Sequence, residues 1–173
     1  MKNKKTYPSE VYLNGRWLKP ENAFVSVFDR SFMFGDGIYE VTPFYHGKPF
    51  RLEDHVARVR YCLREMNIDF DTSILEGLML EAVERSGLSK EDSAVYLQIS
   101  RGTAPRSHFI PENTELTLLL YAFRVNLDNF KDRHWKVMAS EDLRWHRCDI
   151  KSTALLANTM ANEAAISAGY DEN

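Results

Sequence analysis

The stretch that decides the fold is Asp-Arg-Ser-Phe-Met-Phe-Gly-Asp-Gly-Ile-Tyr-Glu, residues 29–40. Gly35 and Gly37 flank Asp36, which indicates a tight backbone turn because glycine adopts positive φ at little steric cost. Tyr39 follows at the start of a run rich in β-branched and aromatic residues, so its ring is expected to emerge where a strand begins. An isolated Gly-Asp-Gly is also compatible with a purely structural turn, so the remaining sequence has to distinguish the two.

Paired strands are predicted on both sides of this turn. Asn14-Gly15 lies between two short apolar stretches within residues 11–18, the strongest local signal for a hairpin with a type I′ turn. Residues 38–45 and 49–51 are the next pair, with the chain turning at 46–48. This part of the chain is therefore expected to be antiparallel.

The hydrophobic period then changes from that of a strand to that of a helix. Apolar residues recur at spacings of four and three through residues 52–66, which predicts an amphipathic helix. A second helix is predicted around residues 74–83, and Gly87 stands where a glycine commonly ends a helix. Both helices have one apolar side and need a surface to cover.

Two more strands complete the predicted first domain. Residues 94–100 alternate apolar and polar side chains, and residues 116–123 are nearly all apolar. A polar loop containing proline, residues 101–115, joins them. Strands, two helices and strands again predict an α+β domain over residues 1–125, a mostly antiparallel sheet with helices on one face.

The rest of the chain reads as the start of a second unit. Residues 126–133 are polar and are predicted to form an interdomain linker. Residues 134–173 begin a second α/β domain, with a strand at 135–139 and an alanine-rich helix at 153–168 that ends at Gly169. One strand and one helix are too little for a separate core, so this second domain is expected to be incomplete.

Composition excludes several classes of protein. The 173 residues are 44% hydrophobic and 27% charged, with a net charge of −3, which gives no general basic surface for nucleic acid. No apolar run approaches the ~20 residues of a membrane span. The two cysteines, Cys62 and Cys148, form no metal-type or redox pair, which favours reduced thiols in a cytoplasmic protein without a bound metal.

Taken whole, residues 29–40 resemble the N-terminal signature of the class IV, or fold type IV, pyridoxal-phosphate-dependent aminotransferases. This family contains D-amino acid aminotransferase, branched-chain aminotransferase and aminodeoxychorismate lyase. Three further matches follow in the family's order: His-Val-Ala-Arg at 55–58, Arg-Gly-Thr-Ala-Pro-Arg-Ser-His at 101–108 and Arg-Trp-His-Arg-Cys-Asp-Ile-Lys-Ser at 144–152. The second of these is typical of the D-amino acid aminotransferases, to which the chain is most similar.

The resemblance implies a cofactor site. Lys151 matches the lysine that forms a Schiff base with pyridoxal 5′-phosphate, and it follows a strand-like Asp-Ile and precedes a helix. Arg58 matches the arginine that binds the cofactor phosphate, as a guanidinium fork can. His55 and Arg144 match positions that support the cofactor ring. Cys148 is expected to be packed rather than reactive.

The resemblance also implies a substrate site for an amino acid and a 2-keto acid. Tyr39 would orient the substrate or the lysine through its hydroxyl. Arg106 and His108 flank Ser107, so in an extended backbone both point to the same side, as binding of a carboxylate requires. In the family this loop, here residues 101–115, reaches across a homodimer and completes the partner's site.

One departure from the family bears on activity. Members have a longer C-terminal domain, which supplies a glutamate for the pyridine nitrogen and polar turns for the phosphate; Glu172 comes too soon after the lysine helix to be that glutamate. We therefore expect the 173 residues to be a fragment that alone binds the cofactor poorly and transaminates slowly. A natural short form that acts as a non-catalytic binding or assembly module is the alternative. Branched-chain aminotransferase and 4-amino-4-deoxychorismate lyase are the alternatives within the family.

Overall fold

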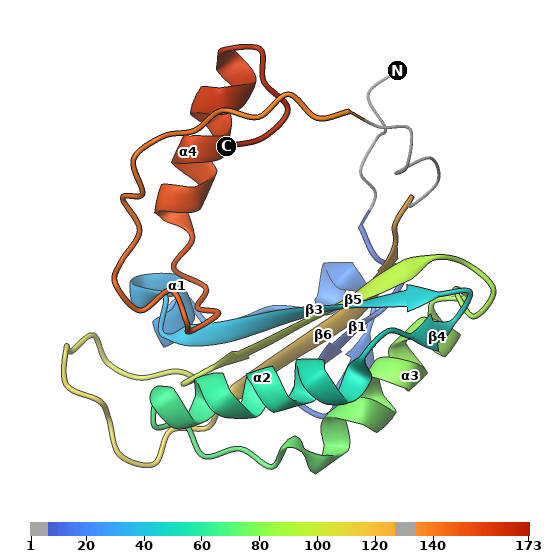
Figure 1. The fold of residues 1–173 in the computed structure, drawn as a ribbon. Coiled ribbons are helices and arrows are strands. Elements are labelled where there is room, and N and C mark those ends of the chain that lie inside the picture. The colour runs from blue at the N-terminus through green and yellow to red at the C-terminus, as the bar shows by residue number, and fades with distance from the viewer. Residues whose placement is uncertain (1–6, 127–133) are drawn as a thin grey trace.

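An antiparallel sheet forms the centre of the molecule, and the computed structural model describes residues 7–126 and 134–173 (Figure 1). The sheet has six strands in the order β2-β1-β6-β5-β3-β4, and every neighbouring pair is antiparallel. The strands are β1 Val11–Leu13, β2 Arg16–Leu18, β3 Gly37–Tyr45, β4 Lys48–Pro49, β5 Ser93–Ser100 and β6 Thr117–Arg124. The helices are α1 Arg30–Phe34, α2 Leu52–Glu65, α3 Leu75–Arg85 and α4 Leu156–Ser167, with short 3-10 turns at Pro20–Asn22 and Thr72–Ile74.

Helices α2 and α3 cover one face of the sheet, and the core lies between them and the strands (Figure 1). Val59 of α2 and Met79 of α3 are almost inaccessible, as are Val95 and Leu97 of β5. Burial of each such side chain contributes roughly 1.5–3 kcal/mol relative to exposure. The predicted α+β class, with helices on one face of an antiparallel sheet, is therefore confirmed.

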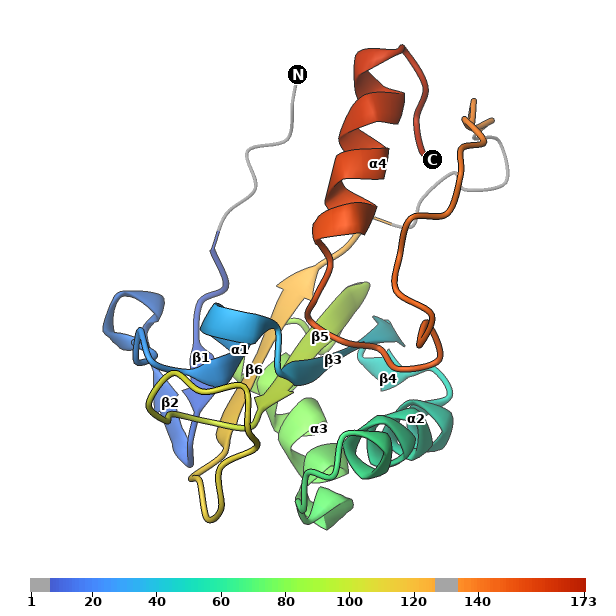
Figure 2. The same cartoon turned by 90° about the vertical axis from the view of Figure 1, so that its left-hand side faces the viewer.

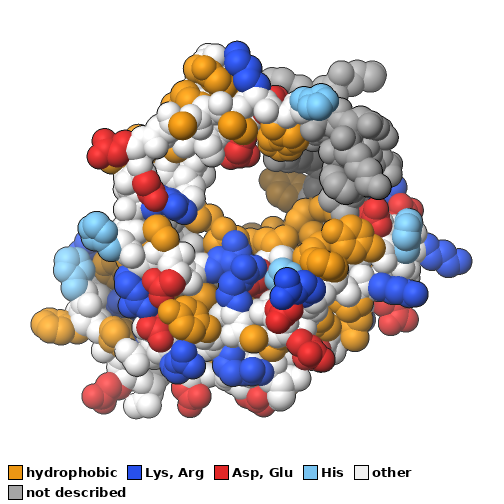
Figure 3. Space-filling view, in the orientation of Figure 1, with side chains coloured by type: hydrophobic (Ala, Val, Ile, Leu, Met, Phe, Trp, Pro, Cys, Tyr) orange, Lys and Arg blue, Asp and Glu red, His pale blue; other side chains and the backbone are white. Residues whose placement is uncertain are grey.

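The opposite face of the sheet carries a row of aromatic rings. Tyr39 of β3 stacks on Tyr96 of β5 with ring centroids 5.9 Å apart, and Tyr96 stacks on Tyr121 of β6 at 5.2 Å. Helix α1 and the C-terminal segment lie on this side, and α4 extends away from the sheet (Figure 2). The space-filling view shows an opening between the sheet and this segment (Figure 3).

Helix α1 was not predicted, although its ends follow ordinary capping rules. The Asp29 carboxylate accepts a hydrogen bond from the Ser31 amide at 2.8 Å, and Gly35 ends the helix with φ +67°. A Cβ at Gly35 would lie 2.9 Å from the Cβ of Ala154. The predicted tight turn at Gly35 thus also lets the C-terminal segment approach α1.

Two predicted strands need correction. The strand predicted at residues 49–51 is instead β4, Lys48–Pro49. It does not reach residue 51, because Arg51 takes a left-handed conformation (φ 51°) before α2. The strand predicted at 135–139 is wrong, since the described residues there form only an isolated parallel bridge between Val137 and Glu172. A strand needs a neighbour to bond along its length, and local sequence pattern does not supply one.

The C-terminal helix also begins later than predicted, at Leu156 instead of residue 153. The Thr153 hydroxyl donates to the Gly35 carbonyl at 3.1 Å, and the Thr153 amide donates to the Gly37 carbonyl at 3.0 Å. These bonds hold Thr153 against β3, so the helix begins after it.

Of the predicted linker at 126–133, residues 127–133 lie outside the described residues. Among the described helices, none has the length and hydrophobicity to cross a membrane.

Candidate active site

Lys151 is held against the open edge of β3. Strand β4 pairs only with Phe44 and Tyr45, so the first residues of β3 have a free edge. The Tyr39 amide donates to the Lys151 carbonyl at 2.9 Å, and Ile38 forms an antiparallel bridge with Ser152. On the other side, the Lys151 amide donates to Cys62 Sγ of α2 at 3.3 Å. The lysine backbone is thus fixed between β3 and α2.

The side chain of Lys151 lies over Tyr39. Its Nζ is 4.0 Å from the centroid of the Tyr39 ring, a favourable arrangement of a cation and an aromatic face. The Tyr39 ring rests in turn on Tyr96, whose pKa is raised to about 12, mainly by burial, so Tyr96 stays neutral in the physiological range. The stacked rings of the aromatic row therefore support Lys151 from the sheet side.

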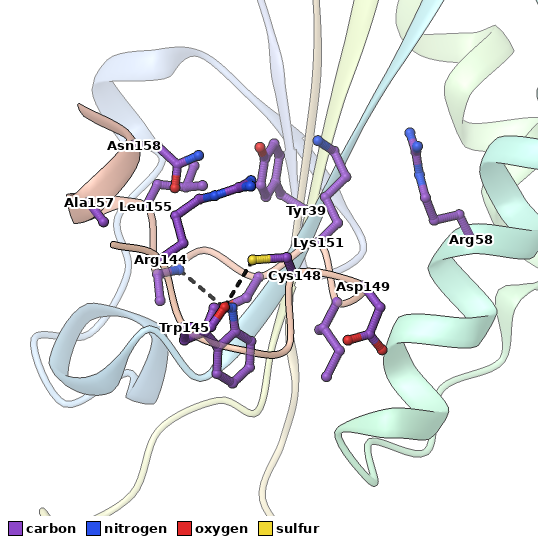
Figure 4. Close-up of a pocket in the computed structure, with 13 residues that line it drawn as sticks. Tyr39, Arg58, Arg144, Trp145, Cys148, Asp149, Lys151, Leu155, Ala157 and Asn158 are labelled. Carbon is purple, nitrogen blue, oxygen red and sulfur yellow. Dashed lines mark hydrogen bonds between the residues drawn. The ribbon is translucent and has the colours of Figure 1, made fainter. Parts of the chain in front are cut away.

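A pocket of about 530 Å³ opens around this pair (Figure 4). Tyr39, Lys151 and Arg58 direct their polar ends to the same side of it (Figure 4). Thirteen residues line it: Tyr39, Arg58, Arg144, Trp145, Cys148, Asp149, Ile150, Lys151, Ser152, Ala154, Leu155, Ala157 and Asn158. Three of them are cationic and one is anionic, so the pocket suits a negatively charged ligand.

Arg58 is oriented by a buried carboxylate, that of Glu40. Arg58 Nε donates to Glu40 Oε2 and Nη2 donates to Oε1, both at 2.7 Å. The Val41 amide donates to Oε1 at 2.8 Å, and Nδ1 of His55 lies 3.2 Å from the same oxygen. Burial, the largest influence, raises the pKa of Glu40, but these partners together hold it below its usual value. The bond to Glu40 correspondingly raises the pKa of Arg58.

Glu40 was missed by the sequence reasoning, although strand parity could have found it. Even-numbered positions of β3, such as Ile38 and Phe44, face the core, so Glu40 has to be buried beneath the sheet. A buried charge requires partners, and a basic helix face in the same domain is the natural source. His55, predicted to support the cofactor ring, does not line the pocket; it reaches Glu40 and supports Arg58 through it.

The segment before Lys151 is attached to α2 by an ionic cluster. Asp149 Oδ2 accepts from the Tyr61 hydroxyl at 2.6 Å and from Arg147 Nη2 at 2.8 Å, and Arg147 also donates to Glu65 at 2.8 Å. The Arg147 and Tyr61 bonds hold the pKa of Asp149 well below its usual range. The cluster is exposed, so we regard it as a local orienting contact of small energetic weight.

Arg144 and Cys148 both belong to the segment before Lys151, and both line the pocket. Arg144 donates to both carboxylate oxygens of Asp142, at 2.9 and 2.8 Å, which lowers the pKa of Asp142 to about 2. The Cys148 thiol is exposed and donates to the Trp145 carbonyl at 2.9 Å. The expectation that Cys148 is packed is therefore wrong, because its loop stands clear of the core.

Arg106 and His108 lie away from this pocket. Both are exposed and both contact the Phe34 ring: Arg106 Cζ is 5.4 Å from its centroid, and the His108 ring centroid is 5.8 Å away. The expectation that the two side chains point to one side agrees with this shared contact. Neither residue is among those that line the pocket of Lys151 in the same chain.

The donor set defines the chemistry available to the pocket. An amine on an aromatic support can attack a carbonyl carbon, while a nearby guanidinium can bind a phosphate or a carboxylate. No group of three or more His, Cys, Asp or Glu side chains that could hold a metal ion is found in the described part of the chain.

The sequence of the chain is similar to those of known proteins. A family model described as amino-transferase class IV matches residues 37–173. A D-alanine aminotransferase from Staphylococcus epidermidis is 38% identical over 165 residues, covering 91% of this chain and 57% of that protein. A D-alanine aminotransferase from Bacillus licheniformis is 34% identical, covering 90% and 56%. The chain thus spans a little over half the length of these relatives.

Solved structures show the same fold. The chain superposes on a branched-chain aminotransferase from Thermoproteus uzoniensis, solved with norvaline, with a TM-score of 0.81 at 24% identity, covering 94% of this chain and 57% of that one. The branched-chain amino acid aminotransferase of Escherichia coli gives 0.81 at 17% identity, covering 95% and 58%. At these identities the likeness concerns the fold.

The contacts of Glu40 predict the effect of Glu40→Gln on stability. All of Glu40's neighbours donate to its carboxylate, so the amide nitrogen of glutamine would face a donor. We expect the free energy of unfolding to fall by about 1–3 kcal/mol at neutral pH, the cost of a buried hydrogen bond to a charged group. Urea unfolding measures this loss of stability. Glu91→Gln is the matched control: it removes an exposed ion pair with Arg124 and should have little effect on the free energy of unfolding.

The loss of stability caused by Glu40→Gln should depend on pH in a defined direction. The pKa of Glu40 in the folded chain lies below the reference value of 4.5. Its contribution to stability is therefore fully present above that value and is lost as the pH falls through the lower, folded pKa. A Glu40→Gln penalty that equals that of Glu91→Gln, or that does not shrink in acid, would contradict this description of the site.

Proposed function

The chain belongs to the class IV aminotransferase family, and on that premise we propose that it is a pyridoxal-phosphate-dependent transaminase. It transfers an amino group between a D-amino acid, of the D-alanine type, and a 2-keto acid such as 2-oxoglutarate. The observation that carries the proposal is the placement of Lys151 Nζ, 4.0 Å from the Tyr39 ring centroid, in a pocket also lined by Arg58.

The choice of substrate rests on the curated relatives and one motif. The relatives at 34–38% identity are named D-alanine aminotransferases. The branched-chain enzymes match at 24% identity or less, so they support the fold and not the substrate. The Arg106-Ser107-His108 pattern resembles that of the D-amino acid enzymes. The chain covers 57% of the Staphylococcus epidermidis enzyme, and we propose the activity for the whole protein.

The residues of the pocket fit pyridoxal phosphate, which carries an aldehyde and a phosphate. Arg58 binds Glu40 through Nε and Nη2, and its Nη1 is not part of that pair. Its side chain is 48% exposed, so it can reach a phosphate in the pocket. Lys151 would supply the amine for the aldehyde, Arg144 would support the cofactor ring from the pocket wall, and His55 would steady Arg58 through Glu40. In this proposal, residues 134–173 belong to the cofactor-binding domain.

The reaction then divides into defined roles. When bound, pyridoxal phosphate supplies the electron sink that allows the Cα–H bond of the amino acid to break. Lys151 Nζ would hold the cofactor through its aldehyde, and its amine would be the base that moves the proton at the substrate Cα. The Tyr39 hydroxyl orients Lys151 or the substrate, and the stacked Tyr96 keeps the Tyr39 ring in place.

Arg106 and His108 bind the substrate carboxylate, and we propose that they do so in the partner of a homodimer. Their position on Phe34, outside the pocket of their own chain, supports this assignment. Loop 101–115 of one protomer then completes the site of its partner.

A coupled assay tests the activity. With the whole protein, pyridoxal phosphate, D-alanine and 2-oxoglutarate, we expect pyruvate to form. Lys151→Ala should lower the rate at least a hundredfold, which is about the contribution of a positioned general base. Lys136→Ala is the control, because Lys136 is likewise stacked on a tyrosine, Tyr170, at 4.5 Å.

Other outcomes of the assay would contradict the proposal in different ways. Reaction with L-leucine but not D-alanine would identify branched-chain activity. Pyruvate formed only from aminodeoxychorismate would identify the lyase. No turnover of any of the three would favour a non-catalytic module.

Mixing two inactive variants tests the shared site. In a hybrid of Lys151→Ala and Arg106→Met chains, one site has both Lys151 from its own protomer and Arg106 from the partner. An equimolar mixture that exchanges subunits should regain about a quarter of the wild-type activity, since half the dimers are hybrids with one intact site. Activity no higher than the mean of the separate variants would show that the loop does not serve its partner.

A further inference from the structure

Arg30 is a buried cation that the roles above do not use. It lies in α1 and is only 4% exposed, so its charge has to be paired. Its Nε donates to Asp36 Oδ2 at 2.7 Å. Asp36 also accepts from Arg101 Nε, at 2.9 and 3.2 Å. One carboxylate therefore holds two buried guanidinium groups, and each of these has donors left for other partners.

The two arginines use these donors differently. Arg101 Nη1 and Nη2 donate to the carbonyls of Asn67 and Met66, at 3.1 and 2.7 Å, where α2 ends. Arg30 Nη1 donates to the carbonyls of Ser107 at 2.8 Å and Phe109 at 3.4 Å, the residues on either side of His108. Arg101 thus stabilises the end of α2, whereas Arg30 reaches the loop formed by residues 101–115.

The segment that Arg30 reaches is the exposed tip of that loop, residues 106–109. The base of the loop is attached by backbone bonds, from the Arg30 amide to the Gly102 carbonyl at 2.9 Å and from the Ala104 amide to the Phe28 carbonyl at 3.2 Å. The tip extends into solvent, with Phe109 86% exposed. Its described contacts with α1 are the two carbonyl bonds to Arg30 and the ring contacts with Phe34.

Arg30 also takes part in those ring contacts. Its Cζ lies 4.8 Å from the Phe34 ring centroid, and Arg106 Cζ lies 5.4 Å from the same point. Arg30 therefore contacts both the carbonyls beside His108 and the ring on which Arg106 and His108 rest. A planar guanidinium can make such contacts in several directions at once, which the single ammonium of lysine cannot.

We propose that Arg30 is a positioning residue for the substrate carboxylate: it fixes the tip of the loop so that Arg106 and His108 are presented together. This inference rests on the proposed function for the role of the two residues. Arg30 touches neither substrate nor cofactor in this proposal and acts only through the carbonyls of Ser107 and Phe109.

The test compares Arg30→Lys with Arg101→Lys. Both variants keep the charge that faces Asp36, both affect a buried arginine, and only the first removes the bonds to the loop tip. Brief tryptic digestion of the folded proteins, followed by mass spectrometry, gives the cleavage rate of the Arg106–Ser107 bond. We expect Arg30→Lys to raise this rate about tenfold or more, since local opening governs cleavage, and Arg101→Lys to leave it near wild type.

Substrate kinetics provide the second readout. Arg30→Lys should raise KM for both D-alanine and 2-oxoglutarate, about tenfold, while kcat changes less than about threefold, since the lysine chemistry is untouched. Urea unfolding establishes that each variant is folded. If Arg30→Lys does not fold, Arg30→Gln, which leaves the Asp36–Arg101 pair intact, takes its place in both measurements.

The outcomes separate this inference from the proposed function. Unchanged cleavage at Arg106–Ser107 overturns the inference whatever the activity. Faster cleavage with unchanged KM values overturns the positioning role, because the tip would then move without consequence for binding. A wild-type chain without transaminase activity contradicts the proposed function, and the cleavage rates alone then decide whether Arg30 fixes the tip.

Discussion

The site depends on one backbone interaction, the pairing of the Lys151 segment with the free edge of β3. The Tyr39 amide and the Gly37 carbonyl bond to Lys151 and Thr153, respectively. This pairing brings two segments more than a hundred residues apart in sequence into register, and it sets Lys151 directly beside Tyr39. Gly35 permits it, because any larger residue there would meet Ala154. Without the pairing, the lysine would be one more exposed amine on a C-terminal segment that buries little of its own surface.

Two carboxylates, the buried Glu40 and the partly buried Asp36, organise the cations around this edge. Glu40 orients Arg58 toward the pocket and Asp36 holds Arg30 and Arg101, so each basic group starts from a fixed position. Such pairs add little net stability, because desolvation offsets most of the attraction, but breaking one leaves a buried charge uncompensated. Their value here lies in geometry: a guanidinium already held on one side presents its remaining donors to a ligand with little loss of side-chain entropy.

Local sequence pattern predicted those elements whose determinants are local. The Asn14-Gly15 turn and the apolar stripes of α2 and α3 are confirmed, since each depends on neighbouring residues. The strand expected at 135–139 failed because pairing is non-local, and Glu40 escaped notice because its main partner, Arg58, lies on another element. Four of the residues that line the pocket, Tyr39, Arg58, Arg144 and Lys151, were predicted by resemblance to a family, and no periodicity would have brought Lys151 to Tyr39. Late helix onset at Leu156 likewise follows from bonds to α1 and β3.

The surroundings of Lys151 distinguish it from the other lysines in the described part of the chain. The most direct measurement treats the protein with pyridoxal phosphate, reduces it with borohydride and locates the phosphopyridoxyl label by peptide mass spectrometry. Lys136 is the internal comparison, because it also lies over a tyrosine ring, at 4.5 Å, but outside the pocket. We expect Lys151 of the whole protein to be labelled at cofactor concentrations at which Lys136 is not, and Glu40→Gln to weaken this preference. Equal labelling of the two lysines would contradict it.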